Sequence, residues 1–93
     1  MDKNEARSIL KEYVQRYRGR TYQDLLQLMT NVDVYEVHTE SGKFYQLEFQ
    51  AIYDDKKMKH IRVHGSISDR GIRAFFPLSE DFIISPDGTF IGE

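Results

Sequence analysis

The sequence predicts a two-layer α+β domain in which two N-terminal helices pack on one face of a four- to five-stranded antiparallel meander sheet. Two observations lead to this fold class. Apolar residues recur at helical spacing as far as Met29, and from Val32 onward they alternate with polar residues at the period of a strand. Short turn sequences separate the alternating runs, so strands that follow one another in the chain are expected to form hairpins.

Two helices are predicted at the start of the chain. Asp2 or Asn4 can cap the first helix, and Gly19 can end it. Thr21 can cap a short second helix that ends near Thr30. The apolar positions that define the sheet-facing sides of both helices are Ala6, Ile9, Leu10, Tyr13, Val14, Tyr17, Tyr22, Leu25, Leu26 and Met29.

The strands follow, separated by turns rich in Gly, Asp and Pro. Pro77 cannot donate a ladder hydrogen bond, so the strand before it ends, bulges or lies at an edge there. Gly65 lies inside a strand, where it can mark a bulge or leave room for a helix side chain, and packing is the favoured explanation. The main strands are predicted near residues 32–37, 45–53, 61–67 and 72–76, with turns at 40–43, 54–57 and 68–71, and a last pair of short segments at 82–84 and 89–91 flanks a turn at 85–88.

Length and composition limit the class of protein. The 93 residues predict one compact domain, residues 1–93, without room for a deep enclosed active site. The absence of cysteine excludes disulfides and thiolate chemistry. The N-terminus is charged from Asp2 onward, and no apolar run approaches the ~20 residues that span a bilayer. We therefore expect a cytoplasmic protein without a membrane partner.

The order of elements resembles the cystatin-like and NTF2-like architectures, in which an N-terminal helix packs across a curved antiparallel meander. The resemblance covers most of the chain and carries no motif. The Gln-x-Val-x-Gly hairpin of protease-inhibiting cystatins has its nearest counterpart at residues 50–54, which lack the valine and the glycine, so inhibition is not implied. The ending PLSEDFIISPDGTFIGE is similar to that of small bacterial proteins of unassigned function.

Polar residues at every second position define one face of the predicted sheet. His60, Arg62 and His64 share this face, and a turn of residues 55–57 would place Glu48 opposite His64 and Gln50 opposite Arg62. Such a face can be a solvated surface held by cross-strand pairs, a docking face, or a chemical site. We predict a docking face for a second copy or a protein partner, formed by Glu36, Glu48, Gln50, Arg62 and His64.

Chemical sites receive less support. His60 and His64 would lie ~13 Å apart along a strand, too far to share one ion. No metal-ligand, nucleophile-elbow or phosphate-loop motif is present, so we predict no metal, no cofactor and no catalysis. A basic helical stripe of Lys3, Arg7, Lys11 and Arg18 could meet phosphates, but the net charge of −2 makes nucleic acid an unfavoured partner.

The rival hypothesis is a small-ligand or enzyme-like domain with an aromatic cleft between helix and sheet. Tyrosine hydroxyls at such a place either find partners in a closed core or line a hydrated cleft. A closed aromatic core is the favoured explanation, with a small-molecule ligand as the alternative. The cleft residues would be Tyr13, Tyr17, Tyr45, Phe49 and Tyr53, together with Phe75.

Overall fold

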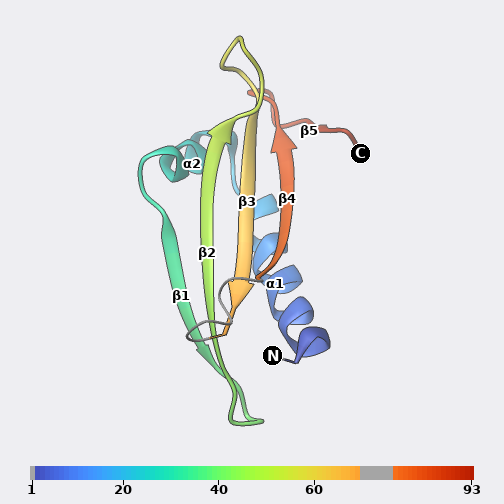
Figure 1. The fold of residues 1–93 in the computed structure, drawn as a ribbon. Helices are drawn as coiled ribbons and strands as arrows, with labels where there is room; N and C mark the ends of the chain where they lie inside the picture. Colours follow the sequence, from blue (N-terminus) through green and yellow to red (C-terminus); the bar gives the residue numbers. More distant parts are fainter. Residues whose placement is uncertain (1, 70–76) are drawn as a thin grey trace.

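The fold was obtained as a computed structural model, which describes residues 2–69 and 77–93. It confirms the α+β class: helices at the N-terminus are followed by a five-stranded antiparallel sheet (Figure 1). The elements are α1 (Lys3–Arg18), α2 (Tyr22–Leu26), the 3-10 turn η1 (Gln27–Met29), β1 (Asp33–His38), β2 (Phe44–Tyr53), β3 (Ile61–Ser68), β4 (Leu78–Ile84) and β5 (Phe90–Ile91).

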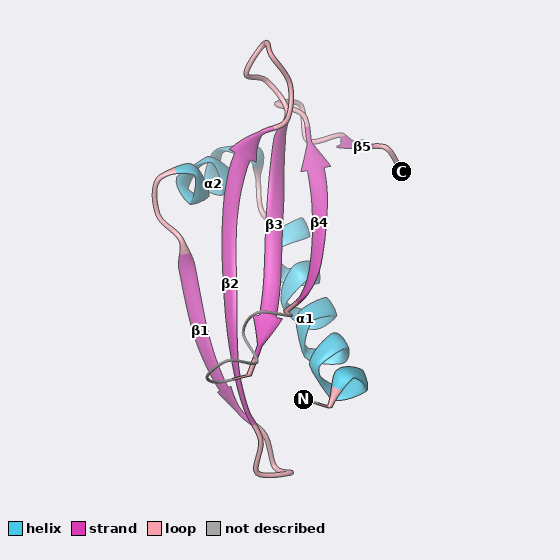
Figure 2. Cartoon of the chain, in the orientation of Figure 1, coloured by secondary structure: helices cyan, strands magenta, loops and turns pink. Residues whose placement is uncertain are grey.

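The sheet is a simple meander in which the strands lie side by side in chain order, β1-β2-β3-β4-β5. Both helices lie on the same side of it, so one face is covered and the other is left open (Figure 2). The strand predicted at 72–76 lies outside the described residues, and β4 is the strand that pairs with β3. No helix within residues 2–69 and 77–93 is both long and apolar enough to cross a membrane.

Capping side chains set the limits of the helices, as predicted. The Asp2 carboxylate accepts a hydrogen bond from the Glu5 backbone N–H at 3.1 Å, and Gly19 ends α1 in a right-handed conformation. The Thr21 hydroxyl accepts from the Asp24 N–H, also at 3.1 Å. Such caps satisfy backbone groups that have no partner within the helix.

The core lies between the helices and the covered face of the sheet. The alternation of β2 and β3 places every second side chain there, where it meets the apolar stripe of α1. The buried apolar residues are Ala6, Leu10, Val14, Tyr17, Leu25, Leu28, Tyr45, Leu47, Phe49, Ala51, Ile61, Val63, Ile67, Phe82 and Ile84.

Gly65 makes room for an aromatic ring from the neighbouring strand. It pairs with Phe49 in a register that continues on both sides without a bulge. A Cβ at position 65 would lie 2.3 Å from the Cε1 atom of Phe49, well inside van der Waals contact. Packing therefore explains this glycine, although the residue that fills the space comes from β2 rather than from a helix.

The turn between β4 and β5 is built around Asp87. Its carboxylate accepts the backbone N–H of Thr89 at 2.9 Å and the hydroxyl of Ser85. These hydrogen bonds, that of Ser85 foremost, lower the pKa of Asp87 from 3.8 to about 2. A hydrogen-bonded carboxylate keeps its charge at lower pH because its partners stabilise the ionised form.

We expect Asp87→Asn to reduce the loss of stability in acid. Because the folded-state pKa lies below the unfolded-state value, this carboxylate contributes stability above pH about 4 that is lost as the pH falls through about 2. Urea unfolding at a series of pH values would measure the effect. Glu40→Gln, which removes an exposed acid from another turn, is the control, and an unchanged acid slope in Asp87→Asn would contradict the prediction.

Candidate functional site

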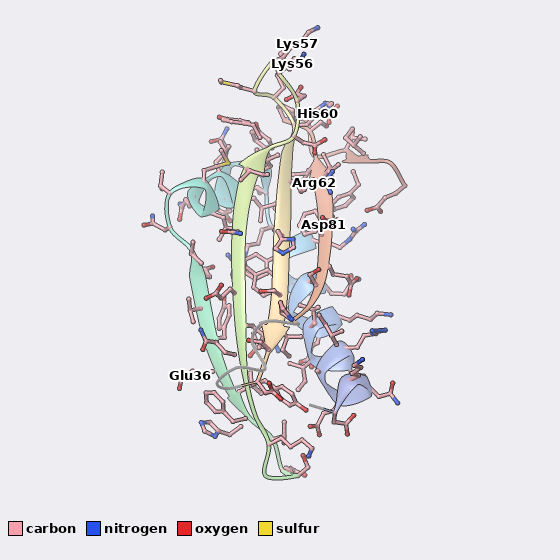
Figure 3. The ribbon with its side chains drawn as sticks, viewed as in Figure 1. Glu36, Lys56, Lys57, His60, Arg62 and Asp81 are labelled. Carbon is pink, nitrogen blue, oxygen red and sulfur yellow. The ribbon has the colours of Figure 1, made fainter. Side chains whose placement is uncertain are left out.

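The open face of the sheet consists of the strand residues that point away from the helices. Figure 3 views the molecule from this side, with Glu36, Arg62 and Asp81 labelled on β1, β3 and β4. Its residues follow from strand alternation and from the pairing of the strands. They are Val34, Glu36, His38, Phe44, Gln46, Glu48, Gln50, Ile52, Arg62, His64, Ser66, Ser79, Asp81 and Ile83.

The pairing of β2 with β3 differs from the predicted one. Glu48 lies opposite Ser66, Gln50 opposite His64 and Ile52 opposite Arg62, so the expected Glu48–His64 and Gln50–Arg62 pairs are wrong by two residues. The reason is a longer turn, which occupies residues 54–60. The carboxylate of Asp55 accepts the backbone N–H groups of Lys59 at 2.8 Å and His60 at 3.0 Å, which stabilises this turn.

Arg62 is held between two carboxylates. Its Nε donates to Asp54 at 3.0 Å, and one terminal nitrogen donates to Asp81 at 2.9 Å. The hydrogen bonds that Arg62 donates to Asp81, and then those to Asp54, raise the pKa of Arg62 above its ordinary value. Two carboxylates around one guanidinium give this part of the open face a net negative charge, so Arg62 is not a free anion-binding group.

A shallow hollow of about 250 Å³ lies on the open face between β2 and β3. Its walls are formed by Gln50, Ile52, Arg62 and His64, so three of the five predicted docking residues meet there. The other two lie outside the hollow: Glu48 precedes Gln50 by two residues on β2, and Glu36 lies on β1. The amide and imidazole groups can exchange hydrogen bonds with an entering polar group, while Ile52, 57% exposed, offers an apolar wall.

Sequence reasoning did not include Asp54 and Asp81 among the candidates. The β3–β4 register brings Asp81 opposite His64 and diagonal to Arg62. That register belongs to β4, which begins directly after Pro77, whereas the sequence predicted strands at 72–76 and 82–84 and so left Asp81 outside both.

On the covered face, three of the predicted cleft residues contact one another. The rings of Tyr17 and Phe49 stack with centroids 4.2 Å apart, and Tyr13 stacks on Phe49 at 6.5 Å. Tyr35, which was not among the candidates, joins them with its centroid 5.0 Å from that of Tyr13. The rings themselves fill the space between helix and sheet that a cleft would need.

A hydrogen-bond network closes this aromatic cluster. The Tyr17 hydroxyl donates to Asp33 at 2.6 Å and shares a 2.7 Å hydrogen bond with the Tyr35 hydroxyl. Burial, and then the hydrogen bond to Asp33, raise the pKa of Tyr17. The guanidinium of Arg20 lies 4.2 Å from the centre of the Tyr17 ring and 3.8 Å from the Asp33 carboxylate. The alternation of β1, which puts Tyr35 on the covered side, could have revealed this network.

Two other cleft candidates lie elsewhere, and Phe75 falls outside the described residues. Tyr45 is buried and donates to the carboxylate of Glu5 at 2.9 Å, and burial followed by this hydrogen bond raises its pKa to about 12. Tyr53 has the parity of the covered face but is 41% exposed near the end of β2.

The polar side chains considered for metal binding or for binding phosphates are mostly apart from one another or already paired. Among residues 2–69 and 77–93 no group of three or more His, Cys, Asp or Glu side chains could hold a metal ion. His60, expected on the open face, precedes β3, and its Nδ1 lies 3.9 Å from Asp55. Arg18 of the basic stripe donates to Glu93 at 2.6 Å, which leaves Lys3, Arg7 and Lys11 as the exposed cations of that stripe.

The fold and the site define a two-layer α+β domain with one uncovered sheet face. Comparison of the chain with protein-family models, characterised proteins and solved structures finds no match. The cystatin-like or NTF2-like relationship therefore stays a prediction.

Proposed function

We propose that the chain is a non-catalytic binding module that associates with a second copy of itself through the open face. The observation that carries this proposal is the uncovered sheet, on which Val34 and Ile52 are 53% and 57% exposed. Apolar side chains on a face with no covering layer gain free energy when a partner removes them from water. A two-fold pair of identical faces is the commonest arrangement of this kind.

The open face carries two acids that are available to a second copy. Glu36 and Glu48 lie on β1 and β2, and within the described part of the chain no hydrogen bond or ion pair engages their carboxylates. Arg62 and His64 lie on β3. A two-fold axis along the strands between β2 and β3 would place each β2 against the other copy's β3, with Glu48 at the level of Ser66 near the centre of the interface.

The size of the face predicts a weak complex. From strand length and spacing, the four longer strands present roughly 500 Å² per copy. A standard stable interface buries about 800 Å² per partner. We therefore expect a reversible dimer that dissociates on dilution, with a Kd on the order of micromolar or weaker.

Sedimentation equilibrium over a concentration series tests this proposal. The wild-type mass should rise toward that of a dimer, and Glu48→Arg should weaken association by about tenfold or more because the longer arginine side chain cannot fit between the two faces near the centre of the interface. Glu40→Arg makes the same charge change in the turn after β1 and serves as the matched control. A wild-type protein that stays monomeric at all concentrations, or an equal effect of both variants, would refute self-association through this face.

A further inference from the structure

The turn between β2 and β3 carries an unusual combination of side chains at its end. We call residues Lys56, Lys57, Met58 and Lys59 the lysine tip. Figure 3 shows Lys56 and Lys57 at one extreme of the molecule, beyond the ends of the strands. The tip projects beyond the ends of β2 and β3, so a large flat surface such as that of a membrane could contact it.

Met58 is exposed in a conformation that its residue type disfavours. Its φ of 57° is the only positive value at a non-glycine position within residues 2–69 and 77–93. Its side chain is 66% exposed, more than any other large apolar side chain of the described chain. Glycine would adopt this backbone conformation without strain and would expose no apolar surface. Asp55 maintains the turn through its hydrogen bonds. Its carboxylate accepts two backbone N–H groups, and its backbone carbonyl oxygen accepts the Met58 N–H at 3.2 Å.

The lysines around Met58 are not neutralised. No ion pair within the described part of the chain involves Lys56, Lys57 or Lys59. Of the two neighbouring acids, Asp54 is paired with Arg62, and Asp55 accepts backbone N–H groups and keeps its single negative charge against three lysines. Three lysines therefore flank an exposed thioether side chain in the sequence, within an otherwise acidic protein.

We propose that the lysine tip binds the surface of an anionic lipid bilayer, with Met58 entering the headgroup region and the lysines contacting lipid phosphates. A bilayer surface offers negative charge and an adjoining apolar layer, so it satisfies both features of the tip. A nucleic acid would satisfy the lysines but would give an exposed apolar side chain at the apex little to bind. The sequence-based expectation of no membrane partner rested on the missing spanning segment, which does not bear on adsorption.

Vesicle sedimentation with the full chain tests the electrostatic half of the proposal. Vesicles of phosphatidylcholine with about one third phosphatidylserine should bind the protein, and pure phosphatidylcholine should not. Lys56→Gln/Lys57→Gln should weaken binding about thirtyfold. The control Lys3→Gln/Lys11→Gln removes the same charge from α1 and should leave binding nearly unchanged. Equal losses in the two variants, or no binding that depends on phosphatidylserine, would overturn the proposal.

The absence of tryptophan from the chain allows a direct test of insertion. Met58→Trp should show a blue-shifted emission on phosphatidylserine vesicles and quenching by brominated acyl chains. Val34→Trp, at an exposed position on the open face, is the matched control and should show neither. Adsorption without a shift or quenching at position 58 would overturn the role of Met58. Binding of the wild type to an oligonucleotide that is lost in Lys56→Gln/Lys57→Gln, with no vesicle binding, would overturn the proposal and identify a nucleic-acid partner instead.

Discussion

Gly65→Ala is expected to destabilise the protein by about 3 kcal/mol, the upper end of the range for overpacked cores. The added methyl group would lie 2.3 Å from Cε1 of Phe49, whose ring is fully buried. That ring cannot swing aside freely because Tyr17 stacks on it at 4.2 Å. Urea or thermal unfolding measures the effect, which for a domain of this size corresponds to a fall in Tm of more than about 10 °C.

Two further variants show whether the clash itself is the cause. Gly42→Ala introduces a methyl group at a turn with φ of 84° and nothing within 4 Å, so it should cost only the backbone strain of about 1 kcal/mol. Phe49→Leu shortens the side chain at the contact, and combined with Gly65→Ala it should cost less than the sum of the single changes. If the losses of stability in the two single variants add up in the double variant, the clash with the Phe49 ring is not the cause, and glycine is needed at position 65 for its backbone conformation.

Tyr17→Phe is expected to reduce the free energy of unfolding by about 2 kcal/mol. The change keeps the stacked ring but removes the hydroxyl that donates to Asp33 and meets the Tyr35 hydroxyl. Hydrogen bonds to charged groups contribute more than neutral ones, and the two remaining polar groups lose a partner. Chemical unfolding of the purified variant is the measurement.

Tyr13→Phe is the matched control, since within the described part of the chain no hydrogen bond involves its hydroxyl, while its ring has similar neighbours. It should change stability by less than about 0.5 kcal/mol. Equal stability of Tyr17→Phe and the wild type would show that the network is not structural. That result would favour the alternative hypothesis, in which the aromatic cluster binds a small ligand.

Local signals in the sequence predicted the fold class well. Asp2 and Thr21 are good caps in any context, and the change from helical to alternating periodicity separates helices from strands without knowledge of the tertiary structure. The parity of each strand also assigned Gln50, Arg62 and His64 to one face correctly, because side chains alternate whatever the strand pairs with.

The exact pairing could not be predicted because it depends on hydrogen bonds within a turn. The two N–H groups that Asp55 binds lengthen the β2–β3 turn, and each further residue of turn moves every pair beyond it. The same turn creates the positive φ of Met58, which no propensity of methionine would suggest. The candidate site was thus assigned to the right face but given the wrong neighbours.

The order of the elements along the chain has a consequence for synthesis. Each strand pairs with the next one made, so every hairpin can close as soon as its second strand has left the ribosome. α1 is different, because the strands it packs against include β3 and β4, which follow it by more than forty residues. The apolar side chains of α1 therefore stay exposed to water, or bound to a chaperone, until those strands have left the ribosome.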